Sequence, residues 1–369
     1  MGPAARWLVV LALAVALVAV PQGLRAFPVA DTEESAADLA ARVLDADRLG
    51  WSGEVSTQGS LDVPLTGDTF GGVVRLLGES SRLRVWWRGP TQHRVDRVRE
   101  SGETDTVRNG GMTIRWRYEG NRVTFTPYSR IRLPDDPDVV PVALAQRLLT
   151  GARPGELSRL PSERVAGRAA AGLRLEPADE RSTIGRVDLW ADQDTGLPLA
   201  VEVYARTPGA RPVLTTRTTS VDLDQPPLSA TRLDISSGVD FSRGVTLDDA
   251  AGADAYAPFA PPEKVAGLPR RGRAEDFGAV GVYGRGPTAL VAVPLRDVVA
   301  HGLREQLRKA GTVRDSGERQ ALEFGPLSVL LDSSGRGNYV LLGTVTSATL
   351  EQAADDLRAG VRLVEPVGR

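Results

Sequence analysis

The sequence predicts an α+β protein in which a strongly curved antiparallel sheet, a half-barrel covered by a few helices, precedes a smaller C-terminal α+β domain. Three observations predict this class. Short segments of alternating apolar and polar residues follow one another from Trp51 to about residue 235, and turn residues separate them. Only two amphipathic helical patterns accompany these segments. Near Pro258 the composition changes to a proline-rich stretch, and a second set of strand and helix patterns follows.

The N-terminus, residues 1–26, predicts a signal peptide or an N-terminal anchor. Arg6 carries a positive charge ahead of an unbroken apolar run, "WLVVLALAVALVAV". This run is shorter than the about 20 apolar residues of a comfortable membrane span, and Pro21 and Gly23 end it. We expect an exported protein on the periplasmic side of the cytoplasmic membrane. Its contact with the membrane is then either indirect or made through an uncleaved anchor.

Residues 31–235 are expected to form the half-barrel domain. Asp31 with Glu34 resembles a capping box, which predicts a helix after it, and Pro141 at a first helical turn predicts a second helix that ends at Gly151. Strands are predicted in "WSGEVST", in the alternating stretch around Val85, and in "HRVDRVRES", "ETDTVRNGG", "ERVAGRAAAGLRLEP" and "VLTTRTTSVDL". The stretch "RVDLWADQDTGLPLAVEVY" predicts a hairpin whose inward residues are Val187, Leu189, Leu199, Val201 and Val203.

The hairpin at residues 112–125 is predicted to have two unlike faces. Gly120-Asn121 is a signal for a two-residue turn, because glycine accepts the positive φ that such a turn requires. This turn sets the pairs Glu119–Arg122, Tyr118–Val123, Arg117–Thr124 and Trp116–Phe125. The apolar residues then share one face, and Arg115 and Arg117 lie on the other, which is most simply the solvated side of the sheet.

The rest of the chain predicts a second, separate unit. Residues 236–269 are rich in proline and are expected to be a linker, and residues 270–369 are expected to form the small C-terminal α+β domain. Its strands are predicted in "GAVGVYG", "TALVAVPL", "ALEFGPLSVLLD" and "NYVLLGTVT". One helix is predicted over residues 297–310, and Ser347 is expected to cap another.

The bulk composition limits the classes of function. The chain has 369 residues, which suits two domains. Its 45 basic and 47 acidic residues leave a net charge of −2, which argues against nucleic-acid binding through bulk electrostatics. Cysteine is absent, so cysteine catalysis, cysteine metal sites and a lipid-modified N-terminal cysteine are excluded.

The sequence offers no motif for catalysis or for metal binding. It has no nucleophile elbow, phosphate loop or paired-histidine signature, and its two histidines, His93 and His301, lack a recognisable catalytic partner. Asp192 and Asp194 match half a calcium loop, but a hairpin turn explains them better. The acidic stretch around Pro137 predicts a solvated loop. We therefore expect no enzyme, cofactor or metal, and a hydrolase that uses His93 with a nearby carboxylate is the remote alternative.

The apolar side of the strands is the candidate binding surface. An alternating strand normally packs its apolar side on its own core, but two helices are few to cover so long a sheet. Part of the concave side can then stay open as an apolar groove for acyl chains or amphipathic segments, with a fully packed core as an equal alternative. The candidate groove residues are Leu83, Val85, Trp87, Ile114, Trp116, Tyr118, Val123 and Phe125.

The order of these pieces resembles one family. A leading helix runs into "WSGEVST", and "VRNGGMTIRWRYEGNRVTFTP", "ERVAGRAAAGLRLEP" and "LWADQDTGLPLAVEVY" follow in turn. Over residues 35–235 the chain is similar to the periplasmic regulators of the sigma-E-type stress response (RseB/MucB-like), and more remotely to the lipoprotein-localisation carriers (LolA-like). The resemblance implies a half-barrel closed by helices over an apolar cavity for lipid or lipoprotein acyl chains. In the regulators it also implies a smaller C-terminal domain.

Two roles follow from this resemblance. One is a sensor that binds acyl chains or lipoproteins and controls a membrane-anchored anti-sigma factor, and the other is a carrier of lipid or lipoprotein. A carrier has no evident use for a separate second module. In a sensor, a ligand in the first domain can shift the docking of the second, provided that its affinity differs between the two docked states. The architecture therefore favours the sensor.

Overall fold

The computed structural model describes most of the chain beyond the predicted export signal, which lies outside the described residues. The described ranges are 29–62, 71–100, 102–128, 132–207, 211–235, 238–243, 259–272, 278–310, 314–335 and 337–363. Within these ranges, none of the helices combines the length and the apolar character that a membrane crossing requires.

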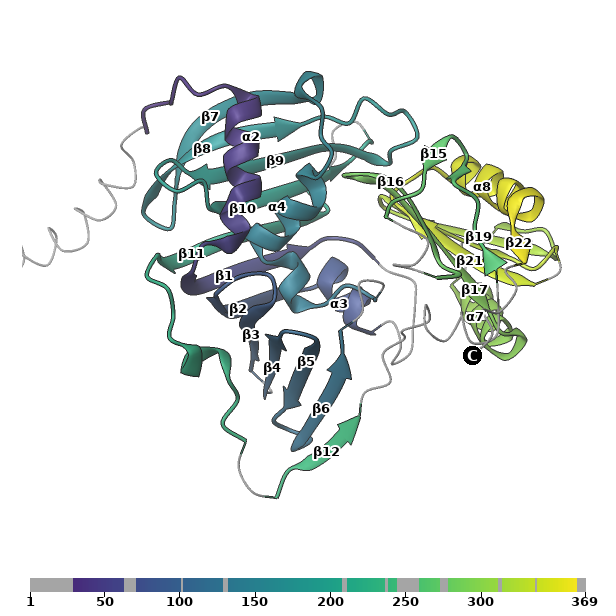
Figure 1. The fold of residues 1–369 in the computed structure, drawn as a ribbon, viewed down its shortest axis with the longest axis horizontal. Helices are drawn as coiled ribbons and strands as arrows, with labels where there is room; N and C mark the ends of the chain where they lie inside the picture. The colour runs from purple at the N-terminus through teal and green to yellow at the C-terminus, as the bar shows by residue number, and fades with distance from the viewer. Residues whose placement is uncertain are drawn as a thin grey trace, which may run out of the picture.

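The predicted α+β class with a large curved antiparallel sheet is confirmed (Figure 1). Twelve strands form the sheet in the order β12-β6-β5-β4-β3-β2-β1-β11-β10-β9-β8-β7. Neighbouring strands are antiparallel except β12, which lies parallel to β6. The strands are β1 (Trp51–Gly59), β2 (Ser80–Trp87), β3 (Gln92–Arg99), β4 (Gly102–Asn109), β5 (Met112–Arg117), β6 (Arg122–Pro127), β7 (Leu157–Val165), β8 (Arg168–Leu175), β9 (Ile184–Asp192), β10 (Pro198–Ala205), β11 (Leu214–Asp222) and β12 (Asp240–Arg243).

Helices α2 (Ala36–Asp45) and α4 (Pro141–Leu149) lie across one face of this sheet, over β7–β11 (Figure 1). We call this face the inner face and the opposite one the outer face. The main core lies between the sheet and these helices, and the inward residues predicted for the β9–β10 hairpin are buried in it as expected. The short elements of this unit are η1 (Ala46–Arg48), α3 (Gly71–Gly78), η2 (Asp136–Val139), η3 (Pro154–Glu156) and η4 (Leu228–Thr231).

Two helix starts differ from the sequence prediction. The N-cap of α2 is Ser35, whose hydroxyl accepts the Asp38 N–H at 3.1 Å. Asp31 instead accepts the backbone N–H of Ser162 on β7, so it ties the chain to the sheet and does not cap the helix. The cap of the last helix is likewise one residue earlier than predicted, since the Thr346 hydroxyl accepts the Thr349 N–H at 3.3 Å. In both places a short hydroxyl side chain directly before the first helical residue satisfies an otherwise unpaired N–H.

The β5–β6 hairpin forms, but the predicted register was wrong by two residues. Trp116 pairs with Val123, and Arg117 pairs with Arg122. Asn121 has a φ of +43° and donates its N–H to the Tyr118 carbonyl at 3.0 Å, so four residues, not two, form the turn. Because side chains alternate with a period of two, this shift changes each partner but keeps the apolar residues together on one face and the arginines on the other.

The second unit is a six-stranded sheet in the order β16-β17-β21-β20-β19-β18. Helix α8 (Ser347–Gly360) packs on one face with Leu330, and α7 (Asp297–Lys309) packs on the other with Leu331. Its strands are β16 (Gly281–Arg285), β17 (Thr288–Leu295), β18 (Arg314–Asp315), β19 (Arg319–Phe324), β20 (Leu327–Asp332) and β21 (Asn338–Gly343).

Parts of the predicted linker pair with both units. Strand β12 extends the large sheet, whereas β14 (Lys264–Val265) and β15 (Leu268–Pro269) form a small hairpin whose Val265 and Leu268 are buried in the core of the second unit. Strand β13 (Phe259–Ala260) pairs with β22 (Arg362–Leu363) close to the end of the chain. The division at residues 235 and 270 stays a prediction.

Candidate functional site: an arginine-lined cavity

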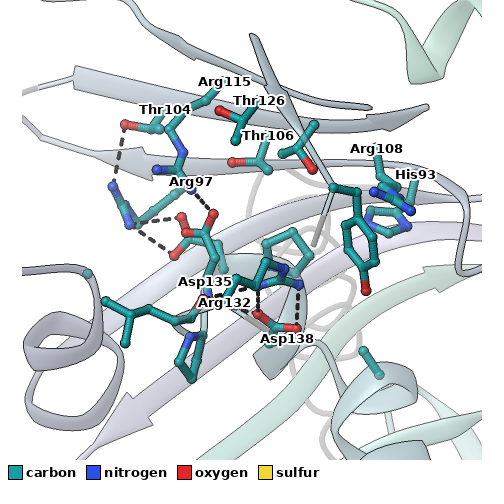
Figure 2. Close-up of a pocket in the computed structure, with 18 of the residues that line it drawn as sticks. His93, Arg97, Thr104, Thr106, Arg108, Arg115, Thr126, Arg132, Asp135 and Asp138 are labelled. Atoms are coloured by element: carbon teal, nitrogen blue, oxygen red, sulfur yellow. Dashed lines mark hydrogen bonds and ion pairs between the residues drawn. The ribbon is translucent and has the colours of Figure 1, made fainter. Parts of the chain in front are cut away.

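A cavity of about 900 Å³ lies on the inner face of strands β3–β6. Its other walls are α3, α4 and the segment 132–138, of which Figure 2 labels Arg132, Asp135 and Asp138. We call it the arginine cavity, because eight arginines and four aspartates line it, which leaves an excess of four positive charges. Helices α2 and α4 fill the corresponding space over β7–β11 with apolar side chains.

The register of the sheet explains why this part of the inner face is polar. Val85 on β2 faces the core and pairs with Val95 on β3. In the same row, Val95 pairs with Thr106 on β4, and Thr106 pairs with Arg115 on β5. The inner face therefore changes from aliphatic to hydroxyl and guanidinium within three strands. Figure 2 shows Thr104, Thr106 and Arg115 above the cavity, on the side opposite Asp135 and Arg132.

The predicted groove residues do not share one face, and this part of the prediction was wrong. Leu83, Val85 and Trp87 lie on the inner face and are at most 2% exposed in the core, and Trp87 also lines the arginine cavity. The other five residues belong to the outer side: Ile114, Trp116, Val123 and Phe125 pack with Leu233, Ile235 and Val239, and Tyr118 stacks on Trp116 and is 43% exposed. The prediction failed because the apolar side of β2 and the arginine side of β5 lie on the same face of the sheet, as the pairing through β3 and β4 shows. The aromatic side of β5 lies on the opposite face.

The acidic stretch at residues 135–138 is an ion-paired wall of the cavity, not the solvated loop that its composition suggested. Asp136 is 1% exposed and accepts two hydrogen bonds, of 2.8 and 2.9 Å, from Arg97. Asp138 pairs with Arg132 at 2.5 and 2.8 Å, and also accepts the Asp135 N–H at 2.7 Å. Asp135 pairs with Arg115. The chain thus places an acidic segment of its own on the arginine face.

Four arginines of the cavity, Arg75, Arg99, Arg108 and Arg117, have no ion-pair partner among the described residues. Arg108 is 8% exposed, and its guanidinium carbon lies 3.2 Å from the centre of the Tyr128 ring. Its Nε and Nη1 atoms are buried, and no described residue gives them a hydrogen-bond acceptor. Burial lowers the pKa of both Arg75 and Arg108. A buried donor without a partner destabilises the folded protein, so a ligand that carries hydrogen-bond acceptors would be stabilised in this cavity.

His93 also lines the cavity, but its surroundings do not suit acid–base catalysis at neutral pH. Its ring stacks on Trp87 with centroids 4.3 Å apart, and its Nδ1 lies 3.2 Å from the Gly89 carbonyl oxygen. Burial lowers its pKa to about 4, so the imidazole is neutral at pH 7. Within the described ranges His93 makes no hydrogen bond to a serine or an aspartate, so the hydrolase alternative gains no catalytic pair.

Two other acidic groups have structural explanations. Asp192 accepts the N–H and the hydroxyl of Thr195 at 2.9 and 2.8 Å, which closes the predicted hairpin turn. On the outer face Asp96, Glu103 and Asp105 lie close enough to hold a cation. Arg94 already supplies one there, since it donates to Asp96 at 2.7 Å and to Asp105 at 2.8 Å. Burial raises the pKa of Asp105 to about 7.

Comparison with known proteins gives matches among solved structures alone. No family model and no curated protein matches the chain. The chain is similar to MucB in the complex structure of Pseudomonas aeruginosa MucA/MucB, with 18% identity and a TM-score of 0.48, over 89% of this chain and 99% of that chain. It is also similar to the LolA superfamily protein NE2245 from Nitrosomonas europaea, with 13% identity and a TM-score of 0.24, over 55% of this chain and 99% of that chain.

Proposed function

We propose that this protein is a non-catalytic extracytoplasmic sensor, in which a ligand in the arginine cavity alters the docking of the second unit and thereby controls a membrane-anchored anti-sigma factor. The observation that carries this proposal is the position of α3, which contacts the cavity and both cores. Arg75 on this helix lines the cavity. Leu76 packs in the main core, and Val74 and Leu77 pack against Leu322 and Phe324 of the second sheet.

The contact between the two units also has a polar part, which supports the same proposal. Arg285 of β16 donates to both carboxylate oxygens of Glu156 at 2.6 and 2.7 Å. Thr183 donates its N–H to the Thr344 carbonyl at 3.1 Å, and the Arg181 guanidinium donates to the Ala266 carbonyl at 2.6 Å. Polar contacts of this kind can exchange for water, which lowers the free-energy cost of a switch between two docked states.

The walls of the cavity favour an anionic ligand over the acyl chains that the resemblance implies. Arginine and threonine dominate its sheet side, and an alkyl chain placed there would leave their polar groups unpaired. This argues against a lipid carrier of the LolA type, whose cargo needs an apolar cavity. We retain the division into residues 31–235, 236–269 and 270–369 as part of the proposal, in which residues 270–369 form the unit that responds to ligand binding.

The proposal is tested by affinity purification from detergent-solubilised membranes of the source organism with the immobilised full chain. We expect recovery of a single-span membrane protein whose cytoplasmic part binds a sigma factor. Arg285→Ala should reduce that recovery several-fold because it removes the pair with Glu156. Arg314→Ala, whose side chain is 74% exposed on the second unit, is the matched control and should not. If the full chain and both variants recover only lipoproteins, the protein is instead a carrier.

A further inference from the structure

We propose that the arginine cavity binds an acidic peptide segment, which lies beside the chain's own acidic segment and pairs with Arg75, Arg108 and Arg117. The inference deepens the proposed function and rests on it in one respect: the peptide would belong to the regulated partner. The carboxylates of residues 135–138 already occupy Arg97, Arg115 and Arg132. The arginine face thus already binds one acidic segment of the same chain. The half of its arginines that have no ion-pair partner among the described residues are available to a second acidic segment.

The unpaired groups on this face are donors that lie in neighbouring rows of the sheet. Arg117 on β5 pairs in register with Thr104 on β4. The Thr106 hydroxyl, one row further, is 2% exposed and has no hydrogen-bond partner in the part of the chain that the structure describes, and the buried Arg108 follows in the next row. Carboxylates accept hydrogen bonds from hydroxyl and guanidinium groups, and guanidinium binds them in a bidentate manner. A chain with several carboxylates therefore fits the spacing of these donors.

The distribution of the arginines favours a peptide over a single small anion or a membrane surface. Arg75 projects from α3, Arg108 from β4 and Arg117 from β5, so the free charges surround the cavity and do not converge on one point. Arg108 is recessed, at 8% exposure, where the headgroups of an intact bilayer would not reach it. A narrow polypeptide segment can enter a cavity of about 900 Å³ and contact several walls.

The test measures the binding of fluorescein-labelled hexaglutamate to the full chain by fluorescence anisotropy, with labelled hexaglutamine as the neutral control. Hexaglutamate should bind in a salt-dependent manner and hexaglutamine should not. Arg117→Glu, a change at an exposed position, should weaken binding by about tenfold or more. Arg82→Glu makes the same change of charge at an exposed position on the outer face of β2 and should change binding less than twofold.

A second variant, Arg108→Gln, removes the buried charge and should also weaken binding, with a melting curve to verify that the protein is folded. If it does not fold, Arg117→Glu against Arg82→Glu decides the question. Equal losses in those two variants, or no binding of hexaglutamate, would overturn the proposal. Binding of phosphatidylglycerol vesicles or inorganic phosphate in place of the peptide would also overturn it and would assign the cavity to a lipid headgroup or to a free anion. These results are independent of whether the full chain recovers an anti-sigma factor, so the two proposals can fail separately.

Discussion

The two halves of the large sheet use the same face in opposite ways. Over β7–β11 the inner face is aliphatic and packs against α2 and α4, whereas over β3–β6 it carries arginine and threonine and borders a cavity. The outer face is reversed: β8 and β9 carry the Arg174–Asp188 ion pair there, and β5 and β6 carry Trp116 and Val123. In each half, the apolar side chains lie on the face that another element covers. A continuous sheet can therefore have its core on one face in one half and on the opposite face in the other.

The largest expected effect lies in the packed half. Leu189→Ala on β9 removes a side chain that is 0% exposed in the main core. Because the cavity left behind collapses only in part, we expect a loss of about 2–5 kcal/mol in the free energy of unfolding. Urea denaturation measures it. A loss below about 0.5 kcal/mol, the usual limit for surface changes, would show that this half is not the packed one.

The next largest effect should come from the contact between the two units. The hydrogen bonds from Arg285 are the main cause that lowers the pKa of Glu156 to about 2. A carboxyl whose pKa is lowered on folding stabilises the folded state above its unfolded pKa, and that stability is lost as the pH falls from about 4.5 towards 2. We expect this loss to be on the order of 3 kcal/mol in the wild type and much smaller in Arg285→Ala. Denaturation at several pH values tests this, and equal pH dependence in the two proteins would contradict it.

The cavity half should show a pH dependence of its own through His93. Burial lowers the folded-state pKa of this histidine to about 4, so the unfolded chain takes up its proton first as the pH falls. Stability should decrease by about 2 kcal/mol between pH 6.5 and pH 4.5. His93→Gln should remove most of this decrease. His301→Gln, which changes the exposed histidine of α7, should retain it, and the opposite result would contradict the buried, neutral state of His93.

The smallest effect should come from the polar lining itself. Thr106→Val puts a methyl group of similar size in place of a buried hydroxyl that has no hydrogen-bond partner within the described ranges. Since no hydrogen bond is lost, we expect a change within about 0.5 kcal/mol, or a slight gain in stability. Thr346→Val is the matched control: its hydroxyl caps α8, and its loss should cost about 1 kcal/mol. A large destabilisation by Thr106→Val would show that this hydroxyl has a structural role.

Much of the fold could be predicted from the sequence because local patterns determine it. Alternation identified the β9–β10 hairpin together with its inward residues, and Pro141 and Gly151 marked α4. The turn of the β5–β6 hairpin was mispredicted because asparagine accepts a positive φ as glycine does, so Gly120-Asn121 suits both a two-residue and a four-residue turn.

The site was missed for a different reason. Two faces of unlike character were recognised in residues 112–125, but which of them is the inner face depends on the pairing through β3 and β4, which alternation within one strand does not determine. The one available signal was the row from Val85 through Val95 and Thr106 to Arg115. Likewise, the burial of Asp136 depends on Arg97, a partner 39 residues away. Long-range pairs of this kind leave no mark in local composition.

If the inner face of β3–β6 is the binding surface of this protein, its arginines should respond to an acidic peptide. Heteronuclear NMR of the arginine Nε–H groups during a titration with hexaglutamate measures this response. We expect the signals of Arg75, Arg108 and Arg117 to shift as the peptide concentration rises, while those of Arg82 and Arg84 on the outer face of β2 stay in place. Shifts confined to Arg82 and Arg84, or equal shifts on both faces, would contradict it.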